Sequence, residues 1–240
     1  MSYVLVLTAI SLLILVHEAG HFIAAKSVGI PIGRFSIGFG RRVWGFTRNN
    51  TEYRLCLIPC GGYVLPDIAS DGEFFLLPLT KRVLFALGGP LANILGALLC
   101  LSLINMAQSG LSLDAAFLNP VREACRLVLQ TCAVVPQLFG RPNEISGLVG
   151  IVAFGGKQVG TSIYRLLQLC VVLNVNLAVL NLLPIPPLDG GRIVMAILER
   201  GCTPFRRLEV PLAIGGWVAL IALMLYATAL DILRITQGLA

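Results

Sequence analysis

The sequence is poor in charged residues. Only 12% of its 240 residues are Asp, Glu, Lys or Arg, and 57% are hydrophobic. An ordinary soluble domain carries about 25% charged residues, roughly twice this share. The composition excludes a disordered chain, a fibrous chain and a disulfide-rich miniprotein, and it argues against an ordinary soluble enzyme. The length is typical of one domain, or of two at most.

The few charges are spaced so that long uncharged runs lie between them. No charged residue precedes Glu18, and three later gaps contain 31, 23 and 21 uncharged residues. A helix needs about 20 mostly apolar residues to cross the hydrocarbon core, and in lipid its backbone must satisfy its own hydrogen bonds. The sequence therefore predicts an α-helical integral membrane protein with four spanning helices, at about residues 3–27, 83–106, 166–188 and 210–230.

The first of these runs and two shorter apolar stretches need a separate interpretation. The first run is not expected to be a signal peptide, because no basic region precedes it and it contains polar residues of functional type. Leu127–Gly140 and Ile145–Gly156 are too short to span a bilayer. We expect an interfacial helix and a loop there, before the third spanning helix.

The distribution of Lys and Arg predicts the orientation. If the N-terminus lies outside, 12 of the 18 basic residues face the cytoplasm, in the loops after the first and third helices. This bias favours an orientation with both termini outside, and we expect the protein to lie in a bacterial inner membrane. That bias and the attraction of basic residues to anionic lipid account for the net charge of +6. The expected partner is therefore the lipid bilayer, and no nucleic-acid partner is expected.

Cysteine usage indicates no disulfide framework. The chain has seven cysteines, an odd and scattered set. Cys56 and Cys60 are separated by three residues, and no second pair follows them. This spacing is a weak indication of any metal or redox role.

The only two histidines lie four residues apart in the first predicted helix, in the run His17-Glu18-Ala19-Gly20-His21. That spacing puts both imidazoles on one helix face, about one turn apart, which suits two nitrogen ligands of one zinc ion. Glu18 can take a proton from a zinc-bound water and deliver it to the leaving amine. The alternative is a polar patch between helices, but ionisable groups inside a membrane helix are costly and usually functional.

A catalytic zinc site usually has three protein ligands and one open position. Asp189 is the only acid within or bordering the third apolar run, and it follows a proline-rich stretch and precedes two glycines. The prolines should end the helix, and the glycines allow close backbone approach. Under the predicted topology, Asp189 and His17 both lie toward the cytoplasmic side. Asp189 is therefore the expected third ligand, and an aspartate that caps the next helix is the alternative.

The two motifs together resemble those of the site-2 proteases, a family of intramembrane zinc metalloproteases. The family pairs a first-helix HExxH with a later NxxPxxxxDG, matched here by His17–His21 and Asn181–Gly190. Other segments resemble the family's membrane-associated β-loop, its second-helix motif and the segment before its third helix. The β-loop is matched by residues 39–42, 51–55 and 58–64. The second-helix motif is matched by residues 88–93, and the segment before the third helix by residues 146–151. The resemblance extends from residue 1 to about 235.

The resemblance implies hydrolysis of a peptide bond within or near the transmembrane segment of single-span membrane proteins. By this analogy, one zinc ion per chain is bound by His17, His21 and Asp189, and Glu18 is the acid/base. A catalytically silent, client-binding pseudoprotease is one alternative, and a metal transporter is another. The intact motif argues against the first, and the clustering of polar groups at one depth without repeats argues against the second.

The resemblance also implies substrate-binding residues. The β-loop, at about residues 34–66, would pair with an unwound substrate strand, because an edge strand holds an opened peptide by main-chain hydrogen bonds. Asn181 would then bind substrate backbone or stabilise the oxyanion. Helix–helix bonding is the alternative for the asparagines, and a plain hairpin turn is the alternative for the two glycines. The implied residues are Gly61, Gly62, Tyr63, Val64, Asn176 and Asn181.

The chain departs from the bacterial members that carry PDZ domains. Residues 107–164 are too few for a PDZ domain plus the helix expected at 116–139. We therefore expect one membrane-embedded domain over residues 1–240, with no PDZ domain and no CBS domain after the fourth helix. The anti-sigma-factor substrates that are usual for PDZ-containing members are therefore not carried over to this chain. The sequence leaves the oligomeric state open.

Overall fold

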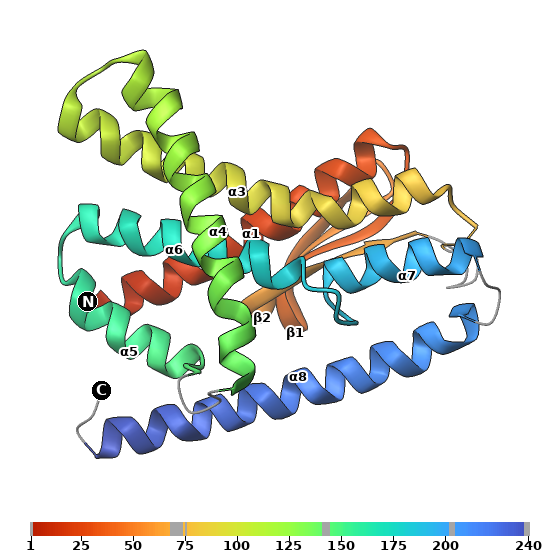
Figure 1. Cartoon of the computed structure of the whole chain (residues 1–240). Coiled ribbons are helices and arrows are strands. Elements are labelled where there is room, and N and C mark those ends of the chain that lie inside the picture. The colour runs from red at the N-terminus through yellow and green to blue at the C-terminus, as the bar shows by residue number, and fades with distance from the viewer. Residues whose placement is uncertain (1, 68–73, 75, 141–144, 202–204, 238–240) are drawn as a thin grey trace. The chain divides into compact units, whose positions relative to one another are not determined.

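The computed structural model describes residues 2–67, 74, 76–140, 145–201 and 205–237 (Figure 1). Two strands and seven α-helices are found in these ranges, with one π-helical turn, η1 (Asp114–Leu118). The strands are β1 (Ile32–Arg48) and β2 (Thr51–Pro66). The α-helices are α1 (Ser2–Ser27), α3 (Leu79–Ser109), α4 (Asn119–Gly140), α5 (Leu148–Val159), α6 (Ile163–Asn181), α7 (Asp189–Gly201) and α8 (Phe205–Thr236).

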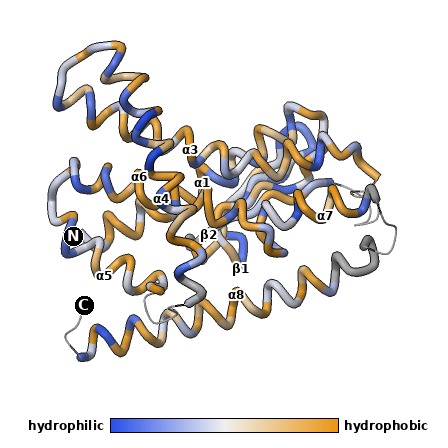
Figure 2. Tube along the Cα trace, viewed as in Figure 1, coloured by the Kyte–Doolittle hydropathy of each residue, from blue (hydrophilic) through white to orange (hydrophobic). Residues whose placement is uncertain are grey.

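Among the described residues, four helices are long and apolar enough to cross a membrane: Ser2–Ser27, Leu79–Ser109, Ile163–Asn181 and Pro211–Thr236. Figure 2 shows that hydrophobic residues predominate along them. The four predicted spans are therefore confirmed as helices. The third ends at Asn181 rather than at residue 188, because the next seven residues include three prolines that cannot donate a helical hydrogen bond.

The sheet lies where the β-loop is predicted. β1 and β2 are antiparallel, and Asn49 and Asn50 connect them with φ angles of 49° and 59°. Positive φ at both loop residues is typical of a type I′ hairpin turn, a conformation that asparagine tolerates well. Gly61 and Gly62 lie inside β2 instead, so they do not form the plain hairpin turn that was the alternative for them.

β2 folds back across β1, so that the first part of β1 has partners on both sides. Residues 34–37 pair with residues 52–55 and also with residues 62–65. Within the described part of the chain, residues 62–65 pair on one side only. This segment is therefore an edge of the sheet with main-chain groups available for another strand.

The chain folds as two compact units. The first unit comprises Met1–Ile10, Ile94–Leu180 and Ala213–Ala240. The second unit comprises Ser11–Asn93 and Asn181–Leu212. Each unit therefore joins segments that lie far apart in the sequence.

The first unit contains a helix where a loop is expected. Of the two short apolar stretches, the earlier forms α4 as predicted, but the later forms α5, so the loop prediction is wrong. The N-terminus of α5 is stabilised by Asp231 of α8, whose Oδ2 accepts a hydrogen bond from the Gly150 amide at 2.7 Å. A carboxylate in this position satisfies an otherwise unpaired amide and interacts favourably with the helix dipole.

The second unit has a small core and a buried ion pair. Ala25, Ile30, Ile32 and Phe85 form the core, which joins the end of α1, the start of β1 and α3. The guanidinium of Arg82, at the start of α3, lies 2.7 Å from the Glu199 carboxylate of α7, and both side chains are at least nine-tenths buried. This pair ties α7 to α3.

We predict that Glu199→Ala destabilises the protein by about 3 kcal/mol, because Arg82 loses its buried carboxylate partner. Unfolding in detergent measures the change. Glu123→Ala is the matched control, because Glu123 is exposed on α4, and it should change stability by less than about 0.5 kcal/mol. Equal stability of the two variants would show that the pair does not hold α7.

Candidate metal centre

The two histidines lie on the face of α1 that packs against α3. Both are buried, with 7% of His17 and 5% of His21 exposed. The two helices approach closely because both carry glycine at the crossing. A Cβ at Gly20 would collide with the Gly88 carbonyl oxygen, and a Cβ at Gly88 would collide with Gly20 in the same way. The small residues therefore bring the imidazoles within reach of α3.

Asp189 completes the group as the first residue of α7. Its side chain is buried, and two glycines follow it. A Cβ at Gly190 or Gly191 would collide with the backbone of residues 182–186, the stretch between α6 and α7. The glycines allow that stretch to fold against the start of α7, as the sequence predicts, and Asp189 is directed toward the histidines.

Three ligand atoms converge at this point. His17 Nε2 lies 3.1 Å from His21 Nε2 and 3.1 Å from Asp189 Oδ2, and His21 Nε2 lies 3.3 Å from the same oxygen. Tetrahedral zinc with nitrogen and oxygen ligands at its usual bond lengths separates ligand atoms by about 3.3 Å. The ligand atoms therefore have a spacing that fits zinc. Among the described residues, His17, His21 and Asp189 form a group of side chains that could hold a metal ion.

The environment of Asp189 favours its charged form. Burial by itself raises the pKa of the carboxyl group, but hydrogen bonds from His17 and His21 outweigh burial and leave the pKa below its ordinary range. Arg192, one turn along α7, lies 4.0 Å from the other carboxylate oxygen. At neutral pH the side chain is a carboxylate, which is the form that binds metal.

α3 supplies contacts to the outer nitrogens of both imidazoles, which the sequence analysis did not identify. His21 Nδ1 lies 2.8 Å from the Phe85 carbonyl oxygen, and His17 Nδ1 lies 3.1 Å from Asn93 Nδ2. A Cβ at Gly89, between these residues, would collide with Nε2 of both histidines. The available signal for Asn93 was a polar residue inside an otherwise apolar helix.

Glu18 lies next to His17 on α1, beside the sheet. A Cβ at Gly62 of β2 would stand 3.2 Å from Glu18 Cγ and 2.8 Å from the Ser36 carbonyl oxygen. Glycine at this position therefore lets the sheet edge lie directly against the glutamate. The candidate acid/base, the three candidate ligands and the edge segment all belong to the second unit.

The remaining predicted substrate residues have varied surroundings. Gly61 has a φ of 127° and lies against the ring of Phe39, which also stacks on Tyr63. Val64 packs against the core of the second unit. Side chains of the edge segment therefore take part in local packing, and the main chain is the part available for binding.

The two asparagines of α6 that were predicted to bind substrate fall in different units. Asn181 is the last residue of the helix and belongs to the second unit. Asn176 belongs to the first unit, where the Thr131 hydroxyl of α4 donates to its Oδ1 at 3.4 Å. For Asn176, the structure therefore shows the helix–helix contact that was the alternative to a substrate role.

The arrangement is suited to hydrolysis. Two neutral imidazoles and one carboxylate can hold a zinc ion with a position left open, and a second carboxylate lies beside them to move a proton. The ligand atoms are buried among apolar helices, where electrostatic interactions are stronger than in water.

Comparison with known proteins agrees with this geometry. The sequence profile of peptidase family M50 matches residues 5–223. A Fusobacterium nucleatum protein named "Putative zinc metalloprotease" is 24% identical, over 98% of this chain and 99% of its own. That alignment spans 337 positions, more than this chain contains, so the relative has segments that this chain lacks.

Two relatives with more specific names are also similar. Protease RseP of Yersinia pestis is 38% identical over 41% of this chain and 24% of its own length. The chloroplastic membrane metalloprotease ARASP of Arabidopsis thaliana is 24% identical over 82% of this chain and 71% of its own. With four helices of spanning length, the chain is an integral membrane protein. It belongs to peptidase family M50, the site-2 protease family of membrane metalloproteases.

Proposed function

We propose that this protein is an intramembrane zinc endopeptidase that cuts single-span membrane proteins within or near their transmembrane segment. The observation that carries this proposal is the triangle of His17 Nε2, His21 Nε2 and Asp189 Oδ2, with sides of 3.1 to 3.3 Å. A client-binding pseudoprotease is not favoured, because such a protein has no need of a complete ligand set beside an intact Glu18.

His17, His21 and Asp189 would hold one zinc ion per chain. Zinc bound there would polarise the scissile carbonyl and make water more acidic. Glu18 accepts the proton of the attacking water and then gives it to the leaving amine nitrogen. Closely packed helices around the group keep bulk water away, and this strengthens the interactions that stabilise developing charge.

The edge of the sheet offers a means to present the substrate. A peptide bond in a helix is shielded by its own hydrogen bonds, so a transmembrane substrate must unwind before it is cut. An extended segment can add to residues 62–65 as a further strand. Gly61, Gly62, Tyr63 and Val64 would bind it by main-chain hydrogen bonds, and the position of Gly62 against Glu18 would bring the strand to the acid/base. Asn181 would bind the same substrate.

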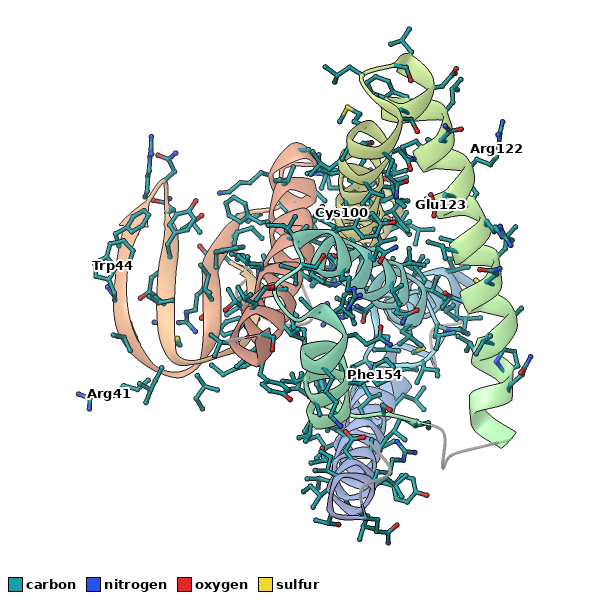
Figure 3. All side chains as sticks on the ribbon, turned by 90° about the vertical axis from the view of Figure 1, so that its left-hand side faces the viewer. Arg41, Trp44, Cys100, Arg122, Glu123 and Phe154 are labelled. Atoms are coloured by element: carbon teal, nitrogen blue, oxygen red, sulfur yellow. The ribbon has the colours of Figure 1, made fainter. Side chains whose placement is uncertain are left out.

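Surface features support a position of the sheet and α4 at the membrane interface. Trp44 is 62% exposed, and Figure 3 shows Trp44 and Arg41 pointing away from the sheet. Aromatic and basic side chains are enriched where bilayer meets water. Arg122 points outward from α4 in the same view, and Arg122 and Glu123 are both exposed. The Lys and Arg bias supports a bacterial inner membrane location, with both termini outside and the metal site toward the cytoplasm.

We predict that Glu18→Gln retains zinc but lowers cleavage of a single-span model peptide by at least about 100-fold, because the amide cannot accept the proton. Elemental analysis measures zinc, and gel analysis of the peptide measures cleavage. Wild-type turnover by this variant would remove Glu18 from its proposed role.

We predict that wild type is purified with about one zinc per chain and that Asp189→Asn contains much less, because a neutral amide is a poor zinc ligand. Asp231→Asn is the matched control, since Asp231 is an equally buried acid in the first unit, and it should retain zinc. Full zinc content in Asp189→Asn would mean that another group is the third ligand.

The proposed orientation is tested with single cysteines in a cysteine-free background. A cysteine in place of Arg48 should be protected from a membrane-impermeant thiol reagent in intact cells, whereas one in place of Arg122 should react. Both should react after the membrane is opened. The reverse pattern would invert the topology.

A further inference from the structure

Asn93 contacts one of the candidate metal ligands from deep inside the protein. It lies on α3, and its side chain is completely buried. Its Nδ2 is 3.1 Å from His17 Nδ1, and its Oδ1 has no hydrogen-bond partner among the described residues. A buried polar atom without a partner costs about 1–3 kcal/mol, so this oxygen requires an explanation.

His21 shows what a metal-ligating imidazole needs from its outer nitrogen. Its Nδ1 lies 2.8 Å from the Phe85 carbonyl oxygen, a shorter contact than the one with the Gly89 amide nitrogen at 3.3 Å, and a carbonyl oxygen can only accept a hydrogen bond. When a metal takes the Nε2 lone pair, the proton of a neutral His21 therefore lies on Nδ1. Hydrogen bonds of this type fix the tautomer and the ring orientation of metal ligands.

His17 has the same requirement but a different outer partner. Its Nε2 is also part of the ligand triangle, so a bound metal leaves the proton of the neutral ring on Nδ1. The atom of Asn93 that faces Nδ1 must then be an acceptor. A half-turn of the Asn93 amide exchanges Nδ2 for Oδ1, so that the oxygen faces the Nδ1 proton and Nδ2 takes the position without a described partner.

We propose that Asn93 is a positioning residue whose Oδ1 accepts the Nδ1 proton of His17 and so directs His17 Nε2 at the metal. This inference rests on the proposed metal site. One helix then supports both imidazoles, because the Phe85 carbonyl and the Asn93 side chain are both on α3. Gly89 lies between them and leaves the space that the two Nε2 atoms occupy.

The test compares three variants for zinc affinity by competition with a chromogenic chelator. Asn93→Leu keeps the approximate volume of the side chain but offers no acceptor, and its zinc affinity should fall about 10- to 100-fold. Asn93→Asp restores an acceptor and should bind zinc within a few-fold of wild type. Asn174→Leu is the matched control, because Asn174 is equally buried in the first unit and also has an unpartnered Oδ1; its zinc affinity should not change.

A second measurement reads the tautomer directly. The chain contains only two histidines, so nitrogen NMR of histidine-labelled, zinc-loaded protein shows two imidazoles. Wild type should show a proton on Nδ1 of both rings, with the His17 proton protected from exchange. In Asn93→Leu the protection of the His17 proton should be lost, while that of His21 should remain.

Three outcomes would overturn the inference, and each has a different consequence for the metal site. Wild-type zinc affinity in a folded Asn93→Leu would show that Asn93 only fills space, and it would leave the metal site intact. Absence of zinc binding by wild type would remove the metal site itself, and the proposed function with it. If both Asn93 variants lost zinc equally, acceptance of the His17 proton would not be the role of Asn93.

Discussion

The structure of the second unit depends on one constraint: polar groups buried among apolar helices must find partners within the protein. Two imidazoles and a carboxylate meet with their ligand atoms 3.1 to 3.3 Å apart. Around them, a carbonyl oxygen and an amide of α3 contact the outer nitrogens. An unpaired polar group in such surroundings costs several kcal/mol. The same grouping that satisfies these side chains places two nitrogens and an oxygen around a point that fits zinc.

Close backbone approach makes this grouping possible. Gly20 and Gly88 let α1 and α3 cross without intervening side chains, and the glycine pair at 190 and 191 lets residues 182–186 fold against the start of α7. Packing of small residues is a usual basis of helix association in membranes, where lipid is as apolar as the helix surface. In this protein it also determines which polar atoms meet. Gly62 extends the pattern to the sheet, whose edge reaches Glu18 for the same reason.

The sequence predicted the spanning helices and the candidate metal-ligand group because their signals are local or unusual. Charge-free runs of sufficient length identify helices, and two histidines four residues apart identify a shared face. It failed where the decisive contact is made by a residue distant in sequence. Ile145–Gly156 was predicted to be a loop, but Asp231 stabilises the start of a helix there. The substrate role of Asn176 stays a prediction, and nothing in the sequence indicated its contact with Thr131 of α4. The prolines after Asn181 correctly indicated the end of α6.

The sequence by itself determined the class of the protein, its four membrane-spanning helices and the three side chains that could hold a metal. Those features follow from composition and from short-range spacing, which are properties of the chain alone. Only the tertiary structure decided which atoms of these side chains converge, which edge of the sheet lies against Glu18, and that Asn93 and the Phe85 carbonyl complete the surroundings of the histidines. These depend on how closely distant backbones approach, and that distance is set by packing between segments that are far apart in the sequence.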